Sequence, residues 1–419
     1  MTTNDELFER AQRVTPGGVN SPVRAFKAVG GRPYFVERAE GPYVWDVEGR
    51  RYIDLVQSYG AIIAGHAHPA IVDAVQRAAG NGTSFGAPTE REVLLAERIT
   101  ERLPSCELVR LVSSGTEATM SAIRVARGFT GRDVVVKFAG NYHGHGDLLL
   151  AEGGSGIAAL GLPGSAGVTA AAVQDTVVAP YNVVPSLDDR VACVIVEPIA
   201  ANMGLVPPAA GFLDGLRAEC DRVGALLVFD EVITGFRVAP GSAQQRFGVT
   251  PDLTTLGKVI GGGLPIAAYG GRRDVMSVVA PLGPVYQAGT LAGNPLATAA
   301  GLAALDLLDA GAFATLEATA TRLADGLAKA LVDVGVVAQV PIESTLVGVY
   351  FGPQAPTDYA GAKQTDEGAY ARFFHSMLQA GVAIAPGAYE VLFPGLSHDE
   401  GVVDEIIAVA ERATAAAFG

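Results

Sequence analysis

The amino-acid sequence predicts an α/β protein with a mainly parallel central sheet and a second, smaller α+β domain formed by both ends of the chain. Two observations support this fold class. Between about residues 90 and 305, short apolar runs alternate with segments of helical periodicity. The runs are rich in valine and leucine, and glycine or a polar residue bounds each of them, as is typical of parallel strands buried on both faces.

The expected elements fall into three consecutive segments. Residues 1–60 belong to the small domain and combine a starting helix and a glycine–proline turn with short strands at 43–47 and 52–55. Residues 61–308 form the large domain, and residues 309–419 complete the small one. The long helices of this last segment are expected at 312–334 and 400–417. The buried strands of the large domain are expected at 108–113, 133–138, 191–197, 225–230 and 252–257.

Composition and charge narrow the range of partners. The chain of 419 residues has a formal net charge of −14, which would repel nucleic acids and anionic membranes. Charged residues make up 18% of the chain, below the roughly 25% of an average soluble protein, so we expect much buried surface and self-association. The expected partners are a small-molecule substrate and a second copy of the chain, with no nucleic acid and no membrane.

Two long stretches without charge do not change this expectation. Residues 153–174 contain six glycines, and prolines interrupt residues 275–305, so neither stretch suits a continuous helix in lipid. Cysteines at 106, 193 and 220 show no spacing typical of a zinc site or a disulfide framework. The N-terminal residues lack the apolar core of an export signal, so a cytoplasmic location is expected.

Polar side chains lie directly after several of the apolar runs, at or just beyond the ends of the predicted strands. These are Ser113-Ser114-Gly115-Thr116, Glu197, Asp230 and Lys258. In sheets of this kind, ligands bind beyond the carboxyl ends of the strands. We therefore expect these residues to share one site.

The stretch SSGTEA (113–118) allows two interpretations. A glycine turn at a helix start, with hydroxyl side chains beside it, suits a phosphate, because free backbone N–H groups and the helix dipole favour an anion. The alternative is an ordinary helix cap, with Glu117 three residues after Ser114. The sequence leaves both interpretations open.

Asp230 and Lys258 also have alternatives. Asp230 could hold a magnesium ion, cap a turn or pair with a protonated heterocycle. A P-loop is excluded, because DLTTLGKV (252–259) lacks its first glycine and a hydroxyl residue after the lysine. Lys258 could extend to solvent as a structural residue, or it could form an imine with an aldehyde, which arginine cannot do.

An imine-forming lysine, an acid for a ring nitrogen and a phosphate site are together what pyridoxal phosphate requires. Tyr142, in NYHGHGD (141–147), offers an aromatic ring that could stack on the cofactor. The histidine pairs at 143 and 145 and at 66 and 68 have no third ligand at a suitable spacing, so no metal site is expected.

Together these motifs resemble the class III aminotransferase family of fold-type I pyridoxal-phosphate enzymes. The resemblance rests on SSGTEA, on EPI (197–199), on FDEVITGFR (229–237), on TLGKVIGGGLP (255–265) and on QAGTLAGNP (287–295). Within the family, PGGVNSPVRAF (16–26), YHGHGD and the glycine-rich stretch 154–168 resemble the glutamate-1-semialdehyde aminomutase branch. Departures from the residues usual in that branch occur at Tyr59-Gly60-Ala61, Gly146 and Gly387.

The resemblance implies a set of cofactor contacts. Lys258 would bind the cofactor covalently and move protons, and Asp230 would contact its ring nitrogen. Thr290 would complete the phosphate site from the other subunit of a homodimer. The remaining contacts would come from Ser114, Gly115, Thr116, Tyr142 and Asn202.

The resemblance also implies the substrate contacts and the reaction. Arg24 would receive the substrate carboxylate beside Ser21, and Glu390 would lie near the substrate amines. The aminomutase branch converts glutamate-1-semialdehyde to 5-aminolevulinate for tetrapyrrole (porphyrin) biosynthesis, with the cofactor cycling between pyridoxamine and pyridoxal phosphate. The glycine-rich stretch 151–169 is expected to close over the site or, alternatively, to be a flexible insertion.

Two other functions compete with this interpretation. A class III omega-aminotransferase would use a separate amino donor and acceptor and often places an arginine opposite the cofactor, whereas residues 383–396 contain Glu390 and no arginine. A non-catalytic cofactor-binding module is disfavoured by the acidic charge and by the lack of a DNA-binding appendage.

Overall fold

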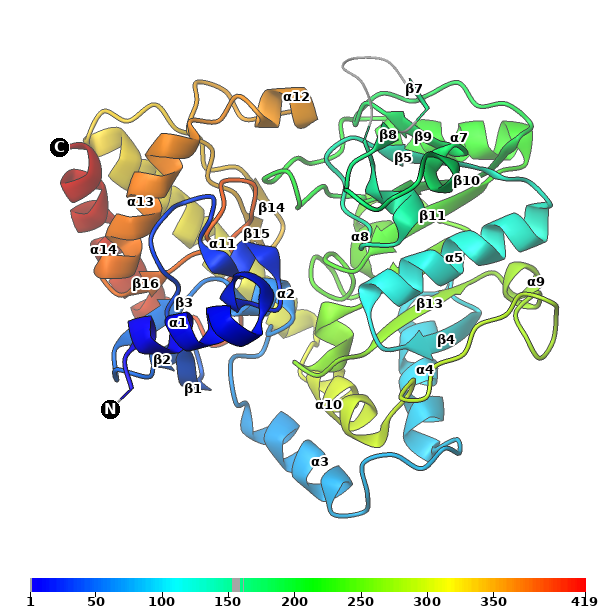
Figure 1. Ribbon diagram of the computed structural model, residues 1–419, viewed down its shortest axis with the longest axis horizontal. Coiled ribbons are helices and arrows are strands. Elements are labelled where there is room, and N and C mark those ends of the chain that lie inside the picture. The colour runs from blue at the N-terminus through cyan, green and yellow to red at the C-terminus, as the bar shows by residue number, and fades with distance from the viewer. Residues whose placement is uncertain (1, 153–158, 161) are drawn as a thin grey trace.

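The computed structural model describes residues 2–152, 159–160 and 162–419, which form two lobes (Figure 1). One lobe contains both termini, and the other contains an eight-stranded sheet. The expected α/β fold class with a mainly parallel sheet is confirmed. The boundaries at 60 and 308 stay a prediction. Residues 153–158 and 161, which belong to the glycine-rich stretch expected to close over the site, lie outside the described residues.

The central sheet combines a parallel core with an antiparallel edge. In spatial order its strands are β4 (Leu108–Val112), β13 (Ala267–Gly271), β12 (Leu253–Leu256), β11 (Leu226–Glu231), β10 (Val191–Val196), β5 (Val134–Phe138), β9 (Thr176–Ala179) and β7 (Ala159–Leu160). The five strands from β12 to β9 pair in parallel. Strand β13 runs antiparallel to both β12 and β4, so β4 and β12 point the same way and end at the same edge.

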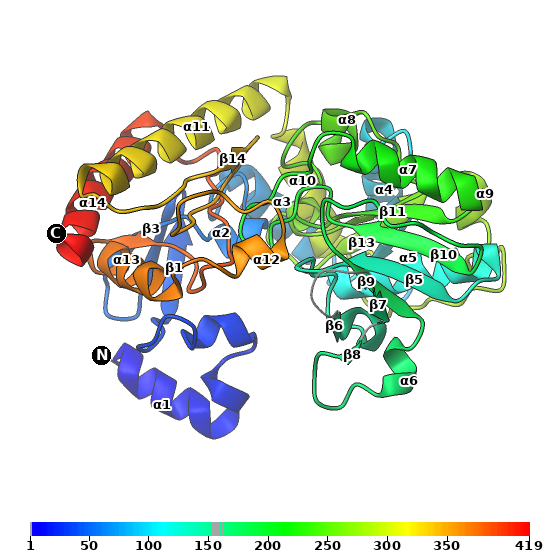
Figure 2. The same ribbon diagram turned by 90° about the horizontal axis from the view of Figure 1, so that it is seen from above.

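Both faces of the sheet are covered by helices (Figure 2). Val194 of β10 and Leu227 of β11 pack into the apolar cluster that contains residues of α7 (Phe212–Val223). Their sequence neighbours Ile195 and Val228 pack on the opposite face with residues of α5 (Gly115–Thr130). Because successive side chains of a strand point to opposite faces, a strand covered on both sides reads as a continuous apolar run.

The remaining elements of this lobe surround the sheet. They are α3 (Pro69–Ala79), α4 (Glu90–Arg102), α6 (Ala170–Val173), α8 (Ser242–Phe247), α9 (Arg273–Met276), α10 (Pro295–Asp306), β6 (Ala151–Glu152) and β8 (Leu162–Pro163). In the described part of the chain no single helix is long and apolar enough to cross a membrane. Helix α10 together with α11 (Ala310–Asp333) meets the length and composition criteria, but the pair is bent by 80°.

The lobe with the termini is built from both ends of the chain. Its four-stranded sheet has the order β1 (Val36–Glu40), β2 (Tyr43–Asp46), β3 (Arg51–Asp54) and β16 (Val382–Ala383). Strand β16 pairs in parallel with β3, which joins segments more than 300 residues apart. The other elements of this lobe are α1 (Asn4–Val14), α2 (Gln57–Gly60), α11, β14 (Ile342–Glu343), β15 (Leu346–Val347), α12 (Tyr359–Ala362), α13 (Glu367–Gln379) and α14 (Glu400–Phe418).

Candidate active site

A cavity of about 640 Å³ lies where the carboxyl ends of the large-lobe strands face segments of the small lobe. It is lined by ten of the eleven residues that the family resemblance assigns to cofactor or substrate contacts: Ser21, Arg24, Ser114, Gly115, Thr116, Tyr142, Asn202, Asp230, Lys258 and Glu390. The eleventh, Thr290, is exposed and lines a different cavity of about 400 Å³, together with Phe85 and Asn294. Within one subunit, the structure does not bring Thr290 to the others.

The start of α5 shows that the two interpretations of SSGTEA are compatible. Ser114 is the N-cap residue, and its Oγ accepts a hydrogen bond from the Glu117 N–H at 3.2 Å. The Glu117 carboxylate in turn accepts from the Ser113 N–H at 2.7 Å. Gly115 and Thr116 occupy the first two helical positions, whose N–H groups have no partner within the helix. The helix is therefore capped and still presents a setting that suits a phosphate.

The loop after β5 passes very close to this helix start. Gly144 has φ +87°, and a Cβ atom placed there would lie 2.7 Å from the Thr116 Cα. His145 also contacts the same residue, with its Nδ1 3.2 Å from the Thr116 Oγ1. Only glycine allows this approach, so the loop that carries Tyr142 is held directly beside the phosphate setting.

Asp230 lies near the end of β11, and both oxygens of its carboxylate have partners within the protein. Its Oδ1 accepts hydrogen bonds from the Thr255 hydroxyl and from the Val232 N–H, both at 3.1 Å. Its Oδ2 lies 2.6 Å from the His143 Nδ1. Burial lowers the pKa of His143, which favours the neutral imidazole, and its Nε2 has no hydrogen-bond partner in the described part of the chain. The carboxylate is thus fixed at the wall of the cavity.

Lys258 follows β12 in a left-handed backbone conformation, with φ 46°, at the start of a 3₁₀ turn that ends at Gly261. Enclosure by the protein lowers the pKa of its amine from 10.5 to about 8, although Glu390 and Glu197 act in the opposite direction. A lysine with such a pKa is partly neutral near pH 7.5, and the neutral amine is the nucleophile.

Glu197 holds two loops at the edge of the cavity in place. It follows β10, and its carboxylate accepts hydrogen bonds from the N–H groups of Tyr142 at 2.6 Å and Ala201 at 3.0 Å. Burial and the neighbouring Asp230 raise its pKa to about 7. The same carboxylate therefore fixes the loop of Tyr142, whose side chain is 53% exposed, and the loop that leads to Asn202.

The opposite wall comes from the small lobe. Ser21 and Arg24 belong to a 3₁₀ turn near the N-terminus, and Glu390 belongs to the segment after β16. Burial raises the pKa of Glu390, while Lys258 opposes this shift. Tyr59, one of the positions that departs from the aminomutase branch, also lines the cavity.

Sequence reasoning missed three contributors to this site. His143 directly follows Tyr142 in the loop at the sheet edge, but the sequence pattern excludes it as a metal ligand and assigns it no other role. Thr255 lies on β12, three residues before Lys258, on the strand next to that of Asp230. Phe393 lines the cavity with its ring centroid 5.9 Å from the Lys258 Nζ. Only the first two carried a local signal, which was their position beside a recognised residue.

These residues fit a flat, phosphorylated pyridine cofactor. The capped helix start suits a phosphate, the partnered Asp230 suits a ring nitrogen, and the exposed Tyr142 ring offers an aromatic surface. The remaining requirement is an amine that is more readily deprotonated than an ordinary lysine, and Lys258, with its pKa lowered to about 8, meets it.

Comparison with solved structures shows the same architecture over nearly the whole chain. An omega-transaminase from Sphaerobacter thermophilus is similar with 34% identity and a TM-score of 0.93, covering 99% of this chain and 98% of its own. A transaminase with PLP bound has 32% identity and a TM-score of 0.90, covering 100% and 99%. A glutamate-1-semialdehyde aminomutase from Pseudomonas aeruginosa PAO1, in complex with PMP, has 25% identity and a TM-score of 0.89, covering 99% and 94%.

The family model for class III aminotransferases matches residues 26–407. This range includes the strand ends, Lys258 and Glu390, and it leaves out only the two ends of the chain. The protein therefore belongs to the class III aminotransferase family, and its fold is that of the fold-type I pyridoxal-phosphate enzymes.

Proposed function

We propose that this enzyme is a glutamate-1-semialdehyde 2,1-aminomutase, which moves an amino group within one substrate to give 5-aminolevulinate for tetrapyrrole biosynthesis. The observation that carries the proposal is the charge of the small-lobe wall, where Glu390 lies within electrostatic range of Lys258. The cofactor is pyridoxal 5′-phosphate, alternating with pyridoxamine 5′-phosphate.

The charged residues of the cavity match a substrate with one carboxylate. Among the described residues that line it, Arg24 is the only arginine. Glutamate-1-semialdehyde carries one carboxylate at one end and its amine and aldehyde at the other. Arg24 binds the carboxylate, because a guanidinium group pairs well with it. Glu390 then faces the nitrogen-bearing end, where a carboxylate favours amines and disfavours the second acid group of a keto-acid acceptor.

The residues of the large lobe hold and use the cofactor. When bound, the cofactor supplies the exchangeable amino group and a ring that accepts electrons. The start of α5 would hold the phosphate, and Tyr142 and Asn202, which line the same cavity, would contact the ring. Asp230 would keep the ring nitrogen protonated. Lys258 would act as the base that takes a proton from the substrate carbon and delivers it to the cofactor carbon that exchanges the amino group.

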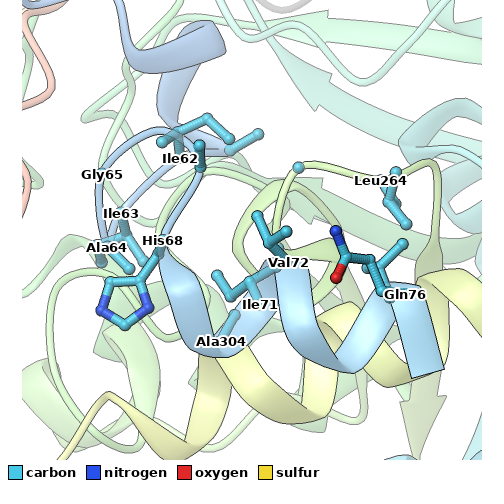
Figure 3. A pocket seen from close by; sticks show the side chains of 15 residues that line it. Ile62, Ile63, Ala64, Gly65, His68, Ile71, Val72, Gln76, Leu264 and Ala304 are labelled. Atoms are coloured by element: carbon cyan, nitrogen blue, oxygen red, sulfur yellow. The ribbon is translucent and has the colours of Figure 1, made fainter. Parts of the chain in front are cut away.

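We infer that the working form is a cytoplasmic homodimer. Thr290 is exposed, and the neighbouring Phe85 and Leu291 are 51% and 55% exposed, which favours their burial by a partner. A second apolar hollow, of about 310 Å³, lies beside α3 and is lined by Ile71, Val72 and other residues (Figure 3). Sedimentation should give twice the chain mass of 43.0 kDa, and a fully active monomer would contradict the dimer.

The second candidate is an omega-aminotransferase, because the omega-transaminase has higher sequence identity to this chain than the aminomutase has, 34% against 25%. The two functions differ in their need for a second substrate. We expect the purified enzyme with its cofactor to form 5-aminolevulinate from glutamate-1-semialdehyde alone. An absolute requirement for a separate amino donor or a keto-acid acceptor would replace the aminomutase by the aminotransferase.

A further inference from the structure

Arg237 is a buried cation that none of the proposed roles uses. It ends the motif FDEVITGFR, and its side chain is 0% exposed. In the described part of the chain no carboxylate lies within ion-pair distance of it. Its Nη2 donates to the Gly60 carbonyl at 2.9 Å and its Nη1 to the Pro394 carbonyl at 3.4 Å, while its Nε has no partner. Because burying an unpaired charge is costly, this arrangement calls for a specific purpose.

The two carbonyls belong to the small-lobe segments that line the active-site cavity. Gly60 closes α2, a turn in which Gln57, Ser58 and Tyr59 all have positive φ, at 46°, 53° and 55°. This conformation is unfavourable for residues with a side chain. It is nevertheless the conformation that brings Tyr59 into the cavity. Contacts from outside the turn hold both of its ends: the Asp54 carboxylate accepts a hydrogen bond from the Gln57 N–H at 3.2 Å, and Arg237 donates to the Gly60 carbonyl.

The second carbonyl follows the segment that carries Glu390 and Phe393 into the same cavity. The two segments also contact each other. The Phe393 N–H donates a hydrogen bond to the Leu55 carbonyl at 2.9 Å, and a Cβ atom at Gly60 would lie 2.7 Å from the Phe393 ring. Arg237, from the large lobe, thus contacts both segments at their junction. Its planar guanidinium can reach two carbonyls at once, which a lysine ammonium on a single stem does less well.

The charge of Arg237 also lies close to Lys258. Its Cζ is 5.2 Å from the centroid of the Phe393 ring, and the Lys258 Nζ is 5.9 Å from the same centroid. Two cations that share one aromatic ring compete for it and repel each other. Consistent with this geometry, Arg237 is among the groups that lower the pKa of Lys258, after burial as the main cause.

We propose that Arg237 is a positioning residue that fastens the Tyr59 turn and the Glu390 segment together beside Lys258, and that its unpaired charge favours the neutral amine of Lys258. The proposal rests on Lys258 being the cofactor lysine, as proposed above. It does not depend on the identity of the substrate.

Hydrogen exchange of the full-length enzyme with its cofactor tests the fastening. In Arg237→Met, amides in peptides covering 55–61 and 388–396 should exchange roughly tenfold faster, as a loss of about 1.4 kcal/mol in local stability gives. Arg132→Met is the matched control, because Arg132 also donates to two backbone carbonyls, of Val191 at 3.1 Å and Val223 at 2.9 Å, and does not line the cavity. Unchanged exchange in both peptides of Arg237→Met would overturn the proposal.

The pH dependence of the cofactor half-reaction tests the charge. The change in cofactor absorbance after addition of an amine gives a rate that needs neither the aminomutase substrate nor its product. This rate should fall at low pH, where the Lys258 amine is protonated. The pH at which it falls should be higher in Arg237→Met, which removes the nearby positive charge, and unchanged in Arg237→Lys, which keeps that charge. If the rate falls at the same pH in Arg237→Met as in the wild type, the proposed effect of the Arg237 charge on Lys258 is refuted.

Arg237→Lys also covers the case in which Arg237→Met does not fold. It should show faster exchange in both peptides, because a lysine ammonium cannot replace the two hydrogen bonds that the planar guanidinium donates to Gly60 and Pro394. Unchanged exchange in Arg237→Lys would then overturn the fastening. If no 5-aminolevulinate forms with the wild type, the aminomutase proposal fails, while these two measurements still decide the role of Arg237.

Discussion

The two walls of the cavity are built differently. On the large-lobe wall, Asp230 lies near the end of the buried strand β11 and Glu197 directly follows β10, and each has two or more hydrogen-bond partners. On the small-lobe wall, Arg24, Tyr59 and Glu390 lie on short turns and loops, and Tyr59 has a positive φ. Under the proposed roles, the cofactor would therefore meet side chains on a rigid sheet edge, whereas the substrate would meet segments that the rest of the protein must hold in place.

This contrast separates chemistry from specificity. Residues on a sheet edge change position little, which suits groups that must meet a cofactor in one geometry. Loops are the usual place for residues that distinguish substrates. Changes on the large-lobe wall should therefore affect turnover or cofactor binding, and changes on the small-lobe wall should affect substrate recognition.

The largest effect is expected for Lys258→Ala on the large-lobe wall. Turnover should fall by at least about 10⁴-fold, because no other amine can replace the nucleophile and base. Circular dichroism should show an unchanged fold. Lys329→Ala, which removes a surface ion pair with Asp333, is the control and should keep full turnover. Substantial turnover in Lys258→Ala would contradict the covalent role.

On the small-lobe wall, Arg24→Gln should mainly raise KM. Losing a charge-assisted contact of about 1.5–3 kcal/mol corresponds to roughly a 10- to 100-fold increase in KM for the carboxylate substrate. The kcat should change much less. Arg32→Gln, at an exposed arginine that pairs with Asp5 and Glu9, is the control. If kcat falls while KM stays constant, Arg24 is not the carboxylate site.

The pH dependence of the reaction rate tests the role of Lys258 on the large-lobe wall. The pKa of Lys258 is lowered to about 8, so its amine is protonated below that pH and neutral above it. The rate of the step that uses Lys258 as a base should rise with pH and level off above about 8. At two units below the pKa only about 1% of the amine is neutral. A rate that is constant between pH 6 and 9 would argue against this base.

The smallest effect is expected for Gly144→Ala, which tests the contact between the Tyr142 loop and the start of α5. The added Cβ would lie 2.7 Å from the Thr116 Cα and must displace the loop or the helix start. Cofactor affinity, measured by fluorescence titration, should fall roughly tenfold.

Gly131→Ala is a matched control for this change, because Gly131 also has positive φ but has open space around the added Cβ. It should lower stability through backbone strain and leave cofactor affinity unchanged. Equal losses of affinity in both variants would mean that the contact with Thr116 is unimportant.

Much of the fold could be predicted because buried parallel strands leave a clear local pattern. The five expected strands correspond to β4, β5, β10, β11 and β12 within about one residue at each end. The sequence pattern does not predict strand β13, because AAYGG has only one strand-favouring residue, Tyr269, among alanines and glycines. Gly271 is required there by close packing, since a Cβ would lie 2.9 Å from the Leu253 side chain and 3.1 Å from the Asp252 carbonyl carbon.

The strands and the polar residues at their ends could be read from the sequence, because buried parallel strands leave a periodic pattern and end at a shared edge. The family could be read from its motifs, such as FDEVITGFR and TLGKVIGGGLP, and not from that pattern. The three-dimensional fold was needed to show that His143 meets Asp230, that Thr290 lies away from the active-site cavity of its own chain and that Arg237 contacts Gly60 and Pro394. These contacts join segments far apart in the chain, and local sequence patterns carry no information about which distant segments pack together.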